Sequence, residues 1–204
     1  MPADQISMLV ELFQRSIALK QEIVAGHLDR IVGMANVCVE ALAGGGKLMI
    51  CGNGGSAADA QHLAAELLVR LRPHVNRDGI AAIALTMDSS TLTACGNDYG
   101  YDELFERMVM ALGRPGDVLL GITTSGKSAN VNRALRTARA RGIRTIGLLG
   151  GDGGGALAEC DVALVVPSRE TGRIQESHIT IGHALMELIE DGLLASGAVK
   201  LAPT

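Results

Sequence analysis

Five short apolar runs recur along the chain, and a polar or glycine-rich segment follows each of them. The runs are built mostly from Val, Ile, Leu and Ala without alternating polar residues, as is typical of strands buried on both faces. Segments with apolar residues at helical spacing lie between them. This alternation predicts an α/β fold with a parallel sheet and right-handed crossovers. The predicted strands are Leu48–Cys51, Ile80–Leu85, Asp117–Ile122, Ile143–Leu149 and Val162–Val166.

Two helices are predicted before the first strand, and they form a predicted N-terminal helical hairpin. Their outer faces are apolar, so residues 1–45 are a candidate surface for packing between subunits, with ordinary core packing as the alternative. We find no linker and no repeat of fixed period, and therefore expect residues 1–204 to form one domain. The predicted helices are Asp4–Gly26, Leu28–Ala43, Ala57–Arg72, Tyr101–Leu112, Ala129–Arg141 and Arg173–Ala195, with a short turn at Ala156–Glu159.

The stretch from Lys47 to Arg72 is predicted to run from strand through a glycine turn into a helix. Ser56 is the predicted helix cap, and the free backbone N–H groups at such a helix start suit a polar or anionic ligand. His62 and Glu66 are four residues apart and so share one face of this helix. This pair could supply a general base and a metal ligand, although many such pairs are simply solvated.

Ligands of open α/β sheets bind beyond the carboxyl ends of the strands, where the polar loops of this chain gather. After the third predicted strand, four hydroxyl side chains surround Gly126 and Lys127, which favours a phosphate group; a serine-rich helix cap is the alternative. The spacing of a nucleotide-binding P-loop is missing, so we expect a small phosphorylated metabolite and no nucleotide. The four hydroxyl residues are Thr123, Thr124, Ser125 and Ser128.

Two further polar groups come from other segments. Asn97 and Asp98 suit sugar hydroxyls, although a plain turn is the more common role of such a pair. Gln175 and His183 lie on the otherwise apolar last helix and need partners if they are buried. A lone histidine there is usually a core residue, and His178 is left without a role.

Composition narrows the class of function. The formal net charge is −4, with two Phe, two Tyr, no Trp and no basic stripe, so we expect no nucleic-acid partner. No apolar run approaches the length of a membrane span, and the N-terminus lacks the pattern of a secretory signal. The four cysteines are scattered without a CxxC pair, which predicts reduced thiols in a cytoplasmic protein.

Four motifs together give the chain a family resemblance: CGNGGSAADAQH with Glu66, LTACGNDYG, GDVLLGITTSGKSANV, and VPSRETGRIQESH with His183. In order, spacing and length the chain resembles the phosphoheptose isomerases, or sedoheptulose 7-phosphate isomerases, of the sugar-isomerase (SIS) fold. The resemblance covers nearly all of the chain. It implies a three-layer α/β/α fold with a five-stranded parallel sheet, and a homotetramer with active sites at subunit interfaces.

The resemblance also implies an activity and a role for each motif residue. The implied reaction interconverts sedoheptulose 7-phosphate and D-glycero-D-manno-heptose 7-phosphate through an enediol, with Glu66 as base and His183 as acid. The phosphate would be held by the four hydroxyls, although the family usually has Ser where this chain has Thr123. The sugar would be held by Asn53, Gly54, Gly55, Glu66, Asn97, Asp98 and Gln175, and zinc by His62, Glu66, Gln175 and His183.

Two other classes of SIS protein are alternatives. Non-catalytic members that bind the replication initiator lack the acid at the position of Glu66, which this chain keeps. Sugar-phosphate sensors that control transcription would need a fused DNA-binding segment, and the N-terminal helices carry no basic patch. The presence of Glu66 together with His183 favours the enzyme.

Overall fold

The computed structural model describes residues 3–86 and 88–202. Five parallel strands form one sheet in the order β2-β1-β3-β4-β5, so β1 lies between β2 and β3. In this register Ile50 is paired with Ala84 on one side and with Leu120 on the other. Every residue of β1 and β3 is buried, as the unbroken apolar runs predict. The strands are β1 Leu48–Gly52, β2 Ala82–Ala84, β3 Val118–Thr123, β4 Arg144–Leu149 and β5 Val162–Val165.

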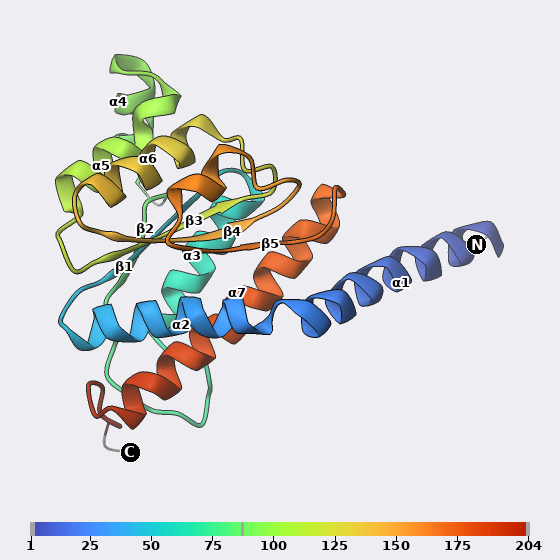
Figure 1. Cartoon of the computed structure of the whole chain (residues 1–204), viewed down its shortest axis with the longest axis horizontal. Helices are drawn as coiled ribbons and strands as arrows, with labels where there is room; N and C mark the ends of the chain where they lie inside the picture. Colours follow the sequence, from blue (N-terminus) through green and yellow to red (C-terminus); the bar gives the residue numbers. More distant parts are fainter. Residues whose placement is uncertain (1–2, 87, 203–204) are drawn as a thin grey trace.

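Helices cover both faces of the sheet, which gives three layers (Figure 1). Helices α2, α3 and α7 pack on one face, and α5 and α6 pack on the other. The predicted α/β fold with a five-stranded parallel sheet flanked by helices is confirmed. The α-helices are α1 Ala3–Gly26, α2 Leu28–Ala43, α3 Gly55–Leu68, α4 Ser89–Asp98, α5 Leu104–Leu112, α6 Ala129–Ala140 and α7 Thr171–Ala195. Short 3₁₀ helices are η1 Tyr101–Glu103 and η2 Gly154–Glu159.

Helix α3 begins earlier than predicted, and Ser56 is not its cap. Gly54 precedes the helix with a φ of 57°, a left-handed conformation that glycine adopts without strain. The chain can therefore turn from β1 straight into α3, which places Ser56 inside the first turn and buries it. The helix also ends before Arg72, because Arg72 precedes Pro73 and that position disfavours helical backbone.

Helix α4 was not predicted, because the segment from Thr86 to Tyr99 has the composition of a loop. Asp88 is the N-cap of this helix, and its carboxylate accepts a hydrogen bond from the backbone N–H of Ser90. Cys95 is the one residue of α4 that is buried. A helix with so little buried surface has no apolar stripe from which its period could be recognised.

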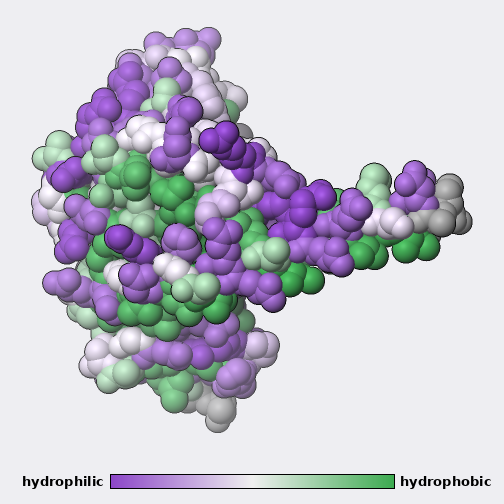
Figure 2. Space-filling view, turned by 45° about the vertical axis from the view of Figure 1, so that its right-hand side comes forward, coloured by the Kyte–Doolittle hydropathy of each residue, from purple (hydrophilic) through white to green (hydrophobic). Residues whose placement is uncertain are grey.

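The N-terminal helix α1 extends away from the body of the molecule (Figure 1). One residue, His27, joins it to α2. Apolar side chains line the projecting part, where they are visible as a band along the arm in Figure 2. About half or more of the surface of each is exposed: Ile6, Met8, Leu9, Val10, Phe13, Ile17 and Val24. Among the described residues, no helix has the length and apolar character that crossing a membrane requires.

His178 of α7 is part of the core. Its ring is completely buried, and its Nε2 lies 3.0 Å from the carbonyl oxygen of Leu149, at the end of β4. A carbonyl oxygen only accepts hydrogen bonds, so Nε2 carries the hydrogen and the neutral imidazole is the donor. Burial lowers the pKa of His178 to about 4, because the charged ring would lose its hydration.

This burial predicts acid sensitivity. Between about pH 6.5 and pH 4 the unfolded chain binds a proton at His178 that the folded chain does not, so stability falls as the pH falls through this window. Between pH 7 and pH 5 we expect His178→Gln, which keeps a donor for Leu149, to remove about 2 kcal/mol of this pH-dependent loss. Urea unfolding at pH 7 and pH 5 measures the effect, with exposed His74→Gln as the control. An unchanged pH dependence in His178→Gln would contradict the prediction.

Candidate active site

The direction of the strand order reverses between β1 and β3. The chain runs from β1 to β2 on one side, and from β3 through β4 to β5 on the other. Such a reversal separates the two following loops and leaves a binding crevice at the carboxyl ends of the strands. The loop of Asn53 and Gly54 after β1 and the loop of residues 124–128 after β3 lie on its two sides.

A pair of amide side chains joins these two loops. Asn53 Nδ2 donates to Asn130 Oδ1 at 2.8 Å, and Asn130 Nδ2 donates back to Asn53 Oδ1 at 2.9 Å. The hydroxyl of Tyr101 also donates to Asn53 Oδ1, at 2.7 Å. Asn130 is buried, and its Oδ1 accepts in addition from the backbone N–H of Val131. Neither Asn130 nor Tyr101 was singled out from the sequence, since their partners come from distant segments.

The hydroxyl side chains after β3 form a compact group. Thr123 Oγ1 and Ser128 Oγ lie 3.1 Å apart, and Thr123 Oγ1 accepts from the backbone N–H of Gly126 at 3.2 Å. Ser128 occupies the N-cap position of α6, but its hydroxyl makes no capping hydrogen bond. Its hydroxyl faces Thr123 instead of the start of the helix, so the alternative of a simple helix cap does not describe it.

A polar cavity of about 450 Å³ adjoins this loop. Its wall brings cationic side chains from two segments, Lys127 and Arg169, to the hydroxyls of Thr124 and Ser125. Lys127 also lies 3.6 Å from Asp152, an exposed pair that contributes little to stability. Positive charge beside hydroxyl and backbone donors is the environment that a phosphate group requires.

Gly126 lets the loop of residues 124–128, called the hydroxyl loop from here on, pack closely against the turn that follows β4. Its φ is +66°, and a Cβ there would lie 2.0 Å from the carbonyl oxygen of Gly153. Its own carbonyl oxygen accepts from Ala156 N at 3.1 Å and from Asn132 Nδ2 at 3.2 Å. The two loops can be this close only because both residues at the contact lack side chains.

Helices α3 and α7 bring His62, Glu66 and His183 together. The Nε2 atoms of the two histidines lie 2.8 Å apart, with their rings edge to face. Glu66 Oε1 lies 3.4 Å from Nε2 of His62, one helical turn away. Close helix packing makes this possible, since a Cβ at Gly182 would lie 2.7 Å from Leu63 Cδ1. The glycine before His183 thus lets α7 approach the residue after His62.

These three residues form a group that could hold a metal ion. Their ligand atoms all lie within 4.8 Å of one another. Nitrogen and oxygen ligands around a tetrahedral zinc ion are roughly 3.3 Å apart, close to the spacings found here. Two imidazoles and a carboxylate are ligand types that zinc prefers in proteins. The residues present therefore fit zinc.

Asp59 is an additional acidic group beside this cluster. Burial raises the pKa of its carboxyl, while the positive charges that His62 and His183 can carry lower it. The buried Oδ2 of Asp59 has no hydrogen-bond partner among the described residues. Local spacing could not place Asp59 beside His183, because its nearness to α7 depends on helix packing.

The other predicted residues lie on different elements. Gln175, at the start of α7, lies against Gly55 at the start of α3, where a Cβ would be 2.7 Å from Gln175 Nε2. Asn97 and Asp98 end helix α4, and Asn97 Nδ2 donates to Asp98 Oδ1 at 2.7 Å. Whether Gln175 completes the metal ligands stays a prediction.

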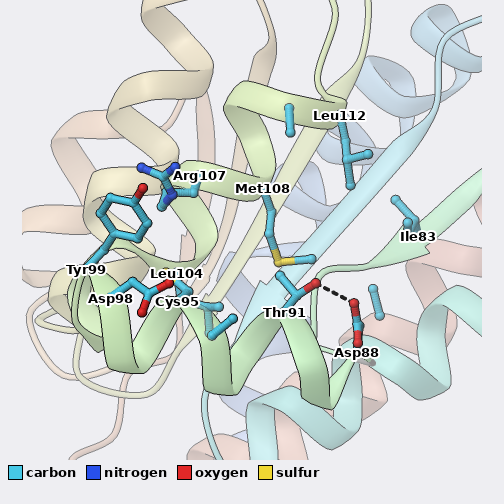
Figure 3. A pocket seen from close by; sticks show the side chains of 13 residues that line it. Ile83, Asp88, Thr91, Cys95, Asp98, Tyr99, Leu104, Arg107, Met108 and Leu112 are labelled. Carbon is cyan, nitrogen blue, oxygen red and sulfur yellow. Dashed lines mark hydrogen bonds between the residues drawn. The ribbon is translucent and has the colours of Figure 1, made fainter.

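Asp98 also borders a largely apolar cavity of about 590 Å³ between α4, α5 and β2 (Figure 3). At that end of the cavity the guanidinium of Arg107 lies 3.6 Å from the centre of the Tyr99 ring. The histidine cluster does not contribute to its lining. This cavity is therefore separate from the group of His62, Glu66 and His183.

Comparison with known proteins assigns the chain to a family. The SIS domain family model matches residues 11–150. The phosphoheptose isomerase of Chlorobaculum parvum is 52% identical over 184 residues, which are 90% of this chain and 88% of that protein. The structure resembles phosphoheptose isomerases from Neisseria gonorrhoeae (TM-score 0.86, 45% identity, 92% and 99% of the two chains covered) and Francisella tularensis (0.87, 38%, 92% and 98%).

The fold and its crevice thus define a SIS protein, and the chain belongs, within the SIS domain family, to the phosphoheptose isomerases. It is accordingly a sugar-phosphate isomerase enzyme. The family resemblance expected from the motifs is confirmed.

Gly126→Ala tests the geometry of the hydroxyl loop. The added methyl would collide with the Gly153 carbonyl, so the loop must move and we expect affinity for inorganic phosphate to fall at least about tenfold, the equivalent of 1.4 kcal/mol. Gly45→Ala is the matched control, since it has φ +84° with open space around it. Isothermal titration with phosphate measures both variants. Equal phosphate affinity in Gly126→Ala and the unmodified protein would show that this loop is not the anion site.

Proposed function

We propose that this enzyme interconverts sedoheptulose 7-phosphate and D-glycero-D-manno-heptose 7-phosphate, the first step in making an activated heptose. The observation that carries the proposal is the meeting of a carboxylate on α3 with an imidazole on α7. This pair lies in a family whose named relatives are phosphoheptose isomerases over most of their length. No observation favours the alternative of a non-catalytic binding protein, whose relatives lack the acid at position 66.

The reaction needs one proton to move between C1 and C2 of the open-chain sugar. In our proposal Glu66 removes the proton from one carbon and returns it to the other. His183 donates a proton to the carbonyl oxygen, which becomes a hydroxyl in the enediol, and later takes one back. General acid–base catalysis of this kind typically contributes a factor of about 10² to 10⁴ in rate.

The rest of the crevice would bind and orient the sugar. The hydroxyl loop and the cavity beside it would hold the phosphate at the far end of the chain, with Thr123, Thr124, Ser125 and Ser128 as donors. The sugar hydroxyls would contact the remaining polar groups, which are Asn53, Gly54, Gly55, Glu66, Asn97, Asp98 and Gln175. Anchoring the distant phosphate fixes where the reacting carbons lie relative to the acid and base.

Zinc is the metal that we propose for the cluster, held by His62, Glu66 and His183, with Gln175 as a fourth ligand. When bound, the ion would act as a Lewis acid that polarises the carbonyl and stabilises developing negative charge. Glu66 has two carboxylate oxygens and His183 has two ring nitrogens, so binding a metal and moving a proton can use different atoms of each residue.

We also propose a homotetramer in which residues 1–45 pack between subunits, and the apolar band on α1 supports such packing. An exposed apolar surface of this extent on an extended helix is typical of a protein interface. The cysteines, all four of which are free thiols, support a cytoplasmic location. The scattered positions of the cysteines in the sequence also predict free thiols.

Glu66→Gln should abolish turnover while the sugar phosphate still binds. Glutamine keeps the size of the side chain but cannot accept the proton, so we expect kcat to fall at least about a hundredfold. Binding of sedoheptulose 7-phosphate by isothermal titration should change less than about threefold, since the phosphate anchor is untouched. The exposed Glu187→Gln on α7 is the control. Substantial isomerase activity in Glu66→Gln would exclude this residue as the base.

Removing the metal tests the zinc proposal. After treatment with a chelator, the protein should take up about one Zn²⁺ per chain, and His183→Gln should weaken that uptake at least about tenfold by removing one ligand. His74→Gln, which changes an exposed histidine, should bind zinc normally. Titration followed by elemental analysis measures both. If the metal-free protein binds no Zn²⁺ and keeps full activity, zinc has no part in the mechanism.

A further inference from the structure

A buried network of charged groups links the ends of the two helices that carry the proposed acid and base. Arg77 follows α3 in the chain and is 6% exposed, while Glu190 of α7 is 0% exposed. Arg77 Nε donates to Glu190 Oε1 at 2.5 Å, and Arg72 Nε donates to Glu190 Oε2 at 2.6 Å. Both carboxylate oxygens of Glu190 are therefore satisfied.

The remaining nitrogens of Arg77 bind the end of α3. Nη2 donates to the backbone carbonyl oxygen of Glu66 at 2.8 Å, and Nη1 donates to that of Leu67 at 2.8 Å. The last carbonyls of a helix lack partners within the helix, and a cation there also favours the helix dipole. Arg77 thus contacts the backbone of the very residue whose side chain is the proposed base.

The other side of the network lies on the helix of the proposed acid. Glu190 follows His183 by seven residues, or about two helical turns, so both lie on the same side of α7. One guanidinium therefore connects the backbone of Glu66 with the helix that carries His183. The C-terminal segment holds Arg77 in turn, since Arg77 pairs with Leu201 and Asp78 N donates to the Lys200 carbonyl oxygen.

A contribution to stability does not explain this network well. Burying charged groups costs hydration, and replacing a buried ion pair by apolar side chains of similar size is often neutral or stabilising. Apolar side chains cannot reproduce the directional hydrogen bonds of this network. The planar guanidinium holds four acceptors at set angles, the fourth being the Asp78 carbonyl oxygen at 3.0 Å from Nη1, and a lysine cannot.

Building on the proposed function, we propose that Arg77 is a positioning residue, which acts through the Glu66 backbone and Glu190 to set the spacing between Glu66 and His183. It does not touch the substrate. Losing it should slow the chemical step more than it weakens binding, because the phosphate anchor lies on other elements.

Two variants test this role. Arg77→Lys keeps the positive charge but loses the N–H donors of the planar guanidinium. The double variant Arg77→Met with Glu190→Leu replaces both members of the ion pair by apolar side chains. At a temperature where each variant is folded, we expect kcat to fall at least about tenfold in both, with KM for sedoheptulose 7-phosphate changed less than threefold. The exposed Arg136→Lys, whose partner is Glu159, should leave both values unchanged.

A merely structural role predicts a different result. Both variants would then keep a normal kcat at a temperature where they are folded, and a normal kcat in either one overturns the proposal. Histidine-ring NMR signals provide a readout without turnover, and we expect those of His62 and His183 to shift in Arg77→Lys while that of His74 does not. If the unmodified enzyme does not convert the sugar, the proposed function fails, and unshifted ring signals would separately reject the positioning role.

Discussion

The close packing of α3 against α7 is the contact on which the rest of the site depends. Gly182 offers no side chain at the crossing, and Leu63 occupies the space that one would fill. This approach puts the Nε2 atoms of His62 and His183 within 2.8 Å and brings Glu66 beside them. A methyl group at Gly182 would separate the two helices and with them the three ligand atoms. The packing of Gly182 against Leu63 thus sets the spacing of the three polar side chains.

The sheet supplies the second constraint. Because β1 and β3 are neighbours whose crossovers lead to opposite edges, the glycine turn and the hydroxyl loop lie on the two sides of this reversal. The reciprocal amides of Asn53 and Asn130 link the glycine turn to the first turn of α6. The proposed phosphate anchor and the proposed acid and base thus lie on separate elements, which the sheet holds in register.

Much of this architecture could be predicted from the sequence, because buried parallel strands appear as unbroken apolar runs. Val118–Thr123 and Arg144–Leu149 differ from the predicted strands by only a residue or so at their ends. Helix α4 could not be predicted, since only Cys95 is buried and no apolar stripe marks its period. Ser56 was wrongly taken as a cap, because a left-handed Gly54 can start a helix without a side-chain hydrogen bond.

The residues of the site divide in the same way. His62 and Glu66 could be paired from their spacing on one helix, and the hydroxyls after β3 from their local pattern. Asn130, Tyr101 and Arg77 could not be found, since their partners are between 10 and 113 residues away in the chain. Contacts across such separations depend on how the helices and loops pack, and no periodicity or local spacing encodes them.

The central claim is that Glu66 and His183 exchange protons with the reacting carbons of a phosphorylated heptose. NMR of sedoheptulose 7-phosphate incubated with the enzyme in deuterated water tests it most directly. The account predicts conversion to the aldose phosphate with deuterium at C2, because a base that carries the proton can exchange it with solvent. Recovery of the ketose unchanged, with no aldose formed, would contradict it.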